Sequence, residues 1–156
     1  MNKTTLLFLY KPKEKKILLA MKKRSFGKGK WNGVGGKLSD GETIKEALVR
    51  ETKEEINVIV NQDDLVQVAT IDFSFQNNSD WNQQAHVFFV EKWNGNPMES
   101  EEMNPKWYHV DSLPFENMWI DDSHWLSLVL EGKKINATFL FNKTGDEIIE
   151  MKILEK

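Results

Sequence analysis

The sequence predicts an α/β fold, a sandwich in which helices pack on the faces of a mixed β-sheet. Short apolar, β-prone runs dominate the chain, and two stretches with helical periodicity interrupt them. The length of 156 residues, with 40% hydrophobic and 29% charged residues, is an ordinary balance for a domain with a sizeable core. No repeat or long linker divides the chain, so we expect residues 1–156 to form a single domain.

A hairpin is predicted at the start of the chain. Residues 4–10 are apolar and β-prone, residues 11–15 form a polar turn that contains a proline, and residues 16–22 resume the strand pattern. The next segment, residues 24–36, is rich in glycine and predicts an irregular loop.

The first main helix is predicted over residues 40–57. Asp40 is the expected N-cap, and Asn57 is a plausible left-handed C-cap. The apolar stripe of this helix, continued at helical period, runs from apolar residues at its start into glutamates at its end.

Strand-like runs dominate the second half of the chain. We expect strands over residues 65–75, 85–93, 106–110, 134–141 and 147–154, the last two forming a hairpin. A second helix is predicted over residues 121–130, with Trp125, Leu128 and Val129 on its apolar side.

Glu51, Glu54 and Glu55 are the residues with the clearest chemical signal. Their i, i+3, i+4 spacing places three carboxylates together on one helical face, near the helix C-terminus, where the helix dipole disfavours negative charge. A hard divalent cation that prefers oxygen ligands, such as Mg²⁺ or Mn²⁺, would relieve their repulsion. The spacing alone also allows an ordinary solvated acidic face.

The surrounding residues resemble the Nudix box. The pattern G-x5-E-x7-R-E-U-x-E-E-x-G-U is matched by Gly36, Glu42, Arg50, Glu51, Glu54, Glu55 and Val58. Thr52 departs from the motif where an aliphatic residue is usual, and Asn57 replaces a glycine. Asn tolerates positive φ, so the second change is harmless. The resemblance implies a Nudix-type α/β/α sandwich with two main helices.

Three further runs are similar to the MutT-homologue group of Nudix hydrolases, the oxidised purine nucleoside triphosphatases. These runs are residues 21–37, 95–107 and 113–125. The similarity implies hydrolysis of a nucleoside triphosphate such as 8-oxo-dGTP to the monophosphate and pyrophosphate, which would remove damaged nucleotides from the pool.

By this resemblance, Glu51, Glu54 and Glu55 bind Mg²⁺, or Mn²⁺, and the carbonyl oxygen of Gly36 completes the site. The metal lowers the pKa of a bound water, which attacks phosphorus in line. Glu102 matches a further metal or base position, with a solvated loop charge as the alternative. Which glutamate removes the proton stays open.

Three basic residues have expected roles beside these acids. Arg50 is expected to orient a glutamate through a bidentate pair, although a structural salt bridge is a close alternative. Lys22 and Lys37 are candidates for phosphate contact, and ordinary surface lysines are the alternative reading.

A base pocket is expected from residues outside the Nudix box. Asn32 can donate and accept hydrogen bonds, and Phe26 and Trp119 offer flat faces for stacking. Asp121 and Asp122 are adjacent acids whose pKa values should rise if both are buried, unless one of them simply caps the second helix.

Three other positions match the pocket lining of the group. Thr5 and Phe73 match directly, whereas Gln83 stands where the group has an apolar methionine. A polar side chain over the base changes which base edges are satisfied, so Gln83 bears on substrate preference.

Other features limit the function classes. The net charge of −3 does not indicate a basic surface for binding nucleic acid. The chain has no cysteine, so it has no disulfide and no thiolate metal site. No segment predicts a membrane span or a signal peptide. We expect a cytoplasmic monomer whose partner is its nucleotide substrate. A Nudix hydrolase of a dinucleoside polyphosphate or a sugar nucleotide is the first alternative, and a catalytically silent nucleotide-binding module is the second.

Overall fold

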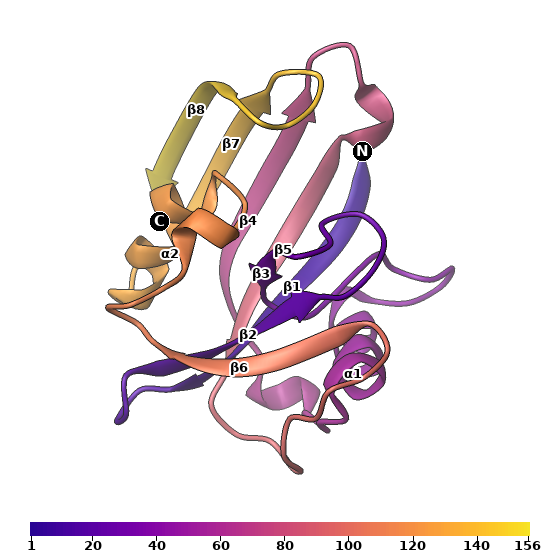
Figure 1. Ribbon diagram of the computed structural model, residues 1–156, viewed down its shortest axis with the longest axis vertical. Helices are drawn as coiled ribbons and strands as arrows, with labels where there is room; N and C mark the ends of the chain where they lie inside the picture. Colours follow the sequence, from indigo (N-terminus) through magenta and orange to yellow (C-terminus); the bar gives the residue numbers. More distant parts are fainter.

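A mixed β-sheet with one main helix on each side forms the molecule (Figure 1). The computed structural model describes residues 1–156. Its strands are β1 Asn2–Lys11, β2 Lys16–Lys22, β3 Trp31–Asn32, β4 Val66–Phe75, β5 Gln83–Val90, β6 Met103–His109, β7 Ile135–Phe141 and β8 Ile148–Glu155. The two main helices are α1 Ile44–Ile56 and α2 Asp122–Leu130. The predicted α/β class is therefore confirmed.

Strand β1 lies in the middle of the sheet. It runs parallel to β5, which pairs antiparallel with β4, and β4 leads through parallel β7 to the edge strand β8. The predicted hairpin of β1 and β2 is present, but only two residue pairs join the strands before β2 turns away to pair with β3 and β6.

Alternating side chains of β1 enter two different cores, as the two-residue period of a strand requires. Phe8 packs with Trp125 and Leu126 of α2 on one face. Leu7 packs with Leu48 of α1 on the other face. The sheet is thus covered on both sides where β1 runs, and this strand connects the α1 side of the molecule to the α2 side.

Helix α1 begins later than the sequence predicts. Asp40 is not its N-cap. Thr43 is the N-cap, and it forms a capping box in which the Thr43 hydroxyl accepts from Glu46 N while the Glu46 carboxylate accepts from Thr43 N. The C-cap prediction is confirmed, because Asn57 adopts a left-handed conformation with φ of 58°.

Several element ends also differ from the prediction. Strand β5 starts at Gln83 and ends at Val90, so its first two polar residues belong to the sheet through pairing with β1 and β4. Strand β6 starts at Met103, three residues early, because it pairs along the whole of β2. In α2, the fully buried Leu126 joins Trp125 and Val129, whereas Leu128 is only partly buried. Neither helix has the length and apolarity of a membrane span.

Candidate active site

The glycine loop before α1 packs directly against β1. The Thr5 backbone N–H donates to the carbonyl oxygen of Gly36 at 2.9 Å, and the Thr5 hydroxyl also donates to it at 3.2 Å. A Cβ atom at Gly35 would lie 2.0 Å from the Thr5 carbonyl oxygen, and φ is +150° there, so only glycine fits. A Cβ at Gly36 would lie 2.9 Å from a carboxylate oxygen of Glu51. The loop is therefore in close backbone contact with β1 at Gly35, and Gly36 lies against the carboxylate of Glu51 in α1.

Glu55 is the most buried of the three helical acids, with only 3% of its surface exposed. Its carboxylate accepts a hydrogen bond from the Gly35 backbone N–H at 2.8 Å. Burial raises the pKa of Glu55 to about 8, and the negative charges of Glu51 and Glu102 act in the same direction. Burial likewise raises the pKa of Glu51. This pair of acids is costly to ionise without a cation beside it.

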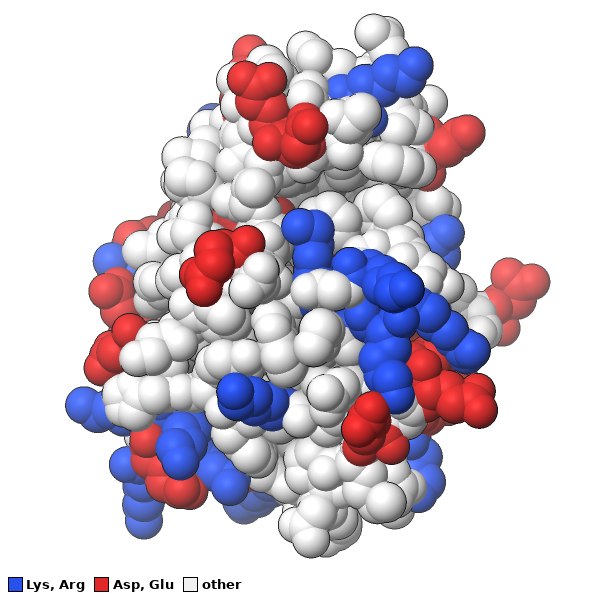
Figure 2. Space-filling view, in the orientation of Figure 1, with Lys and Arg blue, Asp and Glu red and all other residues white.

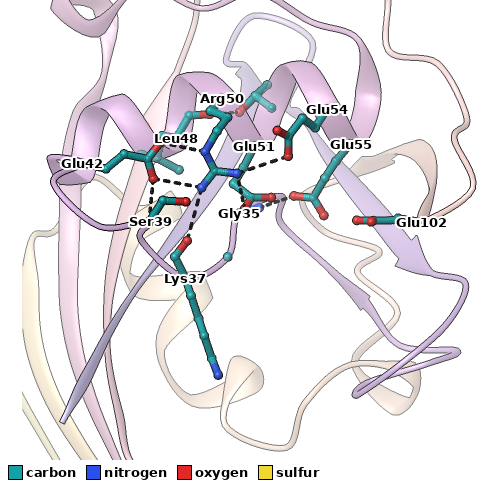
Figure 3. Close-up of polar contacts among 12 residues, drawn as sticks. Gly35, Lys37, Ser39, Glu42, Leu48, Arg50, Glu51, Glu54, Glu55 and Glu102 are labelled. Carbon is teal, nitrogen blue, oxygen red and sulfur yellow. Dashed lines mark hydrogen bonds and ion pairs between the residues drawn. The ribbon is translucent and has the colours of Figure 1, made fainter.

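Arg50 joins the acids to the loop before the helix. Its Nε and Nη2 atoms form a bidentate pair with Glu42, at 2.7 and 3.0 Å, and its Nη1 contacts Glu51 at 3.0 Å and Glu54 at 3.2 Å (Figure 3). The hydrogen bonds from Arg50 lower the pKa of Glu42 to about 2. The bidentate partner is thus Glu42, and the two helical acids receive single bonds.

The acids lie near one another, but their side chains are not arranged as a metal-binding site. No group of three acidic or histidine side chains is gathered closely enough to hold a metal ion as they stand. Glu54 leans toward Arg50 with 58% of its side chain exposed, while Glu102 points toward Glu55 and pairs with Arg24 at 3.3 Å. Glu51, Glu54 and Glu55 would offer an all-oxygen donor set on one helical face, and this chemistry fits a hard divalent cation.

A cavity of about 480 Å³ extends from this loop into the molecule. Gly35, Gly36 and Lys37 line one end, and Asp121 and Asp122 belong to the same lining. All the residues expected to bind substrate line it, namely Thr5, Lys22, Phe26, Asn32, Phe73, Gln83, Trp119, Asp121 and Asp122. The structure thus brings that group of residues into one cavity. Among the predicted catalytic and metal-binding residues, Gly36 belongs to the lining, whereas Arg50, Glu51, Glu54, Glu55 and Glu102 lie outside it.

The two adjacent aspartates have different surroundings. Asp121 occupies the N-cap position of α2, but its side chain makes no capping hydrogen bond and instead accepts one from the indole N–H of Trp125 at 2.9 Å, so the alternative reading of Asp121 as a side-chain cap is wrong. The Oδ2 atom of Asp122 is buried and has no hydrogen-bond partner. Burial raises the pKa of both carboxyls, and the charge of Asp121 raises that of Asp122 further. An unpaired buried carboxyl in a cavity is suited to a polar ligand edge.

Two amide side chains complete the polar lining. The Oδ1 atom of Asn32 accepts from the Gly33 backbone N–H at 2.9 Å, and the Oε1 atom of Gln83 accepts from the Thr4 hydroxyl at 3.1 Å. Both amide oxygens are therefore occupied, and the amide N–H groups are the donors left for a ligand.

Aromatic side chains form a further part of the cavity wall. The rings of Phe26 and Trp119 lie 5.1 Å apart. Sequence analysis missed Trp81, Phe75 and Lys30, which also line the cavity. Trp81 stands in the polar stretch between β4 and β5, and a lone tryptophan among polar residues was the signal that could have identified it.

Basic side chains gather beside the cavity. Figure 2 shows them on the face in view, around the segment that joins β2 to β3, which carries Lys23, Arg24, Lys28 and Lys30. Lys22 lines the cavity itself, and Lys37 presents its carbonyl oxygen to Arg50 at 3.4 Å. Lys23 and Arg24 are paired with Glu99 and Glu102. The lysines of the cavity lining, Lys22, Lys30 and Lys37, are the cations that suit a polyphosphate.

Known proteins resemble this chain over nearly its whole length. The oxidized purine nucleoside triphosphate hydrolase of Mus musculus is 40% identical over 151 residues, which cover 97% of this chain and 93% of that protein. The protein of the same name from Danio rerio is 42% identical over 140 residues, covering 90% and 87%.

Solved structures show the same fold. The MutT protein from Bacillus halodurans superposes with a TM-score of 0.83 at 20% identity, covering 98% of this chain and 97% of that one. A bifunctional NMN adenylyltransferase/ADP ribose pyrophosphatase from Francisella tularensis, complexed with AMP and a Mn ion, has a TM-score of 0.63 at 22% identity, covering 84% and 41%. The NUDIX domain model matches residues 2–129, and with these relatives it shows that the chain belongs to the Nudix hydrolase family.

Proposed function

We propose that this protein hydrolyses oxidised purine nucleoside triphosphates, such as 8-oxo-dGTP, to the monophosphate and pyrophosphate, with Mg²⁺ as the working ion. One observation carries the proposal: a single cavity connects the glycine loop before α1 to the buried Oδ2 atom of Asp122, which has no hydrogen-bond partner. The part of the cavity beside the glycine loop suits phosphates, and the part beside Asp122 suits the polar edge of a base. The mouse and zebrafish relatives, named for this activity, support it.

The acids of α1 have the chemistry that this reaction needs. Nudix hydrolases depend on a divalent metal ion. Such an ion, when bound, neutralises phosphate oxygens and lowers the pKa of a water. Glu51, Glu54 and Glu55 supply the oxygens that hold it, with the Gly36 carbonyl beside them. The Gly35 N–H fixes the direction of the Glu55 carboxylate.

The remaining residues position the substrate. Asp121 and Asp122 face the base, where a shared proton lets the pair donate as well as accept. The free amide N–H groups of Asn32 and Gln83 face acceptor atoms of the base. Lys22 and Lys37 are placed to contact the phosphates.

The working unit is proposed to be one chain, since all the residues assigned to the site belong to it. We propose that it acts as a monomeric, single-domain enzyme in the cytoplasm, on free nucleotides and not on nucleic acid or membranes. The net charge of −3 is consistent with a small anionic ligand, such as a nucleotide, that binds a local basic surface. It does not favour a long polyanion, such as a nucleic acid.

A turnover screen tests this proposal. We expect 8-oxo-dGTP, with Mg²⁺, to have a higher kcat/KM than dGTP, a dinucleoside polyphosphate or a sugar nucleotide, and to release pyrophosphate. Glu55→Gln should lower kcat by at least about 100-fold. The matched control is Glu150→Gln on the exposed surface of β8, which should leave turnover unchanged. Preference for a sugar nucleotide, or full activity of Glu55→Gln, would refute the assignment.

A further inference from the structure

Trp81 stands on the cavity wall formed by the segment between β4 and β5. Its indole packs against Phe75 with ring centroids 5.5 Å apart and against Phe26 with centroids 5.0 Å apart. Phe26 in turn packs on Trp119 at 5.1 Å. The three side chains, Trp81, Phe26 and Trp119, form a continuous aromatic rim and come from three separate segments of the cavity wall.

This rim is only partly covered. Phe26 is 51% exposed and Trp81 is 38% exposed, although both line the cavity. Large aromatic rings that are left half-exposed at a cavity are costly for a free protein and useful for stacking a flat ligand. Trp119 alone would give the cavity one indole face, and Trp81 gives it a second.

The position of Trp81 is fixed by its own segment. The side-chain oxygen of Asn82 accepts from the Phe75 backbone N–H at 2.9 Å, which closes the base of the segment. The amide of Asn78 donates to the Lys143 carbonyl oxygen at 3.0 Å, which ties the segment to the β7–β8 turn. A short 3-10 turn, Ser79–Trp81, then presents the indole. Trp81 is thus held in place before any ligand arrives, and little ordering cost remains for binding.

We infer that Trp81 is a base-contacting residue of the nucleotide site, which recognises flat purine bases together with Phe26 and Trp119. The inference rests on the proposed function, because it assigns a further contact in the same cavity. It also offers a reason why a polar Gln83 is accepted nearby: the apolar contact with the base comes from the indole two residues earlier in the chain.

Binding of a product nucleotide tests the inference without relying on turnover. The probe is 8-oxo-dGMP, titrated calorimetrically in metal-free buffer into the wild-type protein, Trp81→Ala and Trp81→Phe. We expect Trp81→Ala to weaken binding roughly tenfold, as for loss of one stacked ring, and Trp81→Phe to retain most of the affinity. The matched control is Trp93→Ala, because Trp93 stacks on Trp107 away from the cavity lining. Thermal unfolding of each variant verifies folding.

A second pair of variants separates direct contact from support of Phe26. If Trp81 acts only by holding Phe26 in place, Trp81→Ala will cost nothing further in a Phe26→Ala background. We expect instead a further loss of several fold. Wild-type affinity for Trp81→Ala, or no added loss in the double variant, would overturn the inference and leave the proposed function intact. The turnover screen tests the proposed function separately, so a wild-type protein that hydrolyses 8-oxo-dGTP but does not bind 8-oxo-dGMP would overturn the inference alone.

Discussion

Asp121 and Asp122 are adjacent at the start of α2, but their carboxyl groups have different surroundings. The carboxyl of Asp121 meets the indole of Trp125, one helical turn further along, while Asp122 keeps an unpaired buried oxygen. The i, i+4 spacing of Asp121 and Trp125 was visible in the sequence, so this contact could have been predicted. The sequence marks Trp81 as an unusual residue in a polar stretch, but its contacts with Phe26 and Phe75 could not be predicted, because they depend on how the segment between β4 and β5 is held.

Asp122→Asn should change how stability depends on pH. Burial raises the pKa of Asp122 in the folded state above its ordinary value of 3.8, so folding favours the protonated form. That stabilisation is complete below the unfolded pKa and is lost as pH rises through the folded pKa. An asparagine cannot ionise, so the melting temperature of the variant should fall less than that of the wild type between pH 5 and 8, measured by calorimetry without metal.

The control for this measurement is Asp63→Asn. Asp63 is exposed in the short 3-10 turn Gln62–Asp64, outside the cavity lining, and its side chain makes no ion pair or hydrogen bond. This variant should keep the wild-type pH dependence. Parallel curves for the wild type and Asp122→Asn would show that the carboxyl ionises freely in the folded protein, contrary to its burial.

Helix α1 shows how much a sequence determines about one element. Its existence, its acidic end and its left-handed end at Asn57 follow from periodicity and residue type. Its start does not, because Asp40 and Thr43 are both good caps on composition. The bidentate pair of Glu42 with Arg50 favours Thr43 over Asp40 as the N-cap, because it keeps Glu42 in the loop before the helix. Thr43 with Glu46 then completes the capping box.

Thr43→Ala should therefore destabilise the protein by about 1 kcal/mol, which corresponds to a fall in melting temperature of roughly 2–4 °C. The reason is loss of the acceptor for the Glu46 backbone N–H. Thr43→Ser should restore most of the stability. Asp40→Ala is the matched control and should be neutral in the same chemical or thermal denaturation. A larger effect at Asp40 than at Thr43 would contradict the observed helix start.

At the scale of the whole molecule, the sandwich follows from period-two strands and two amphipathic helices, both readable from sequence. The separation of β2 from β1 after two residue pairs was not readable, because pairing of β2 with β6 joins segments more than eighty residues apart. The same holds for the meeting of α1, the glycine loop and β1 at Thr5, which needs the complete sheet.

Metal binding at this meeting point should stabilise the entire fold. An ion held only by the folded protein adds about 2.7 kcal/mol at one hundred times its dissociation constant. Mn²⁺ or Mg²⁺ should therefore raise the melting temperature of the wild type by roughly 5–10 °C, and a chelator should reverse the rise. Glu55→Gln should abolish most of this response, whereas Glu150→Gln should keep it. An identical response in both variants would place the ion elsewhere.

The central strand β1 has one further consequence. It packs against the helix with the acids on one face and against the helix with the aspartate pair on the other. On the proposed assignment, hydrolysis and base recognition therefore depend on helices that lie on opposite faces of one strand. We expect that an exchange of the connection between β4 and β5 would change the preferred nucleobase and leave α1 with its acids intact.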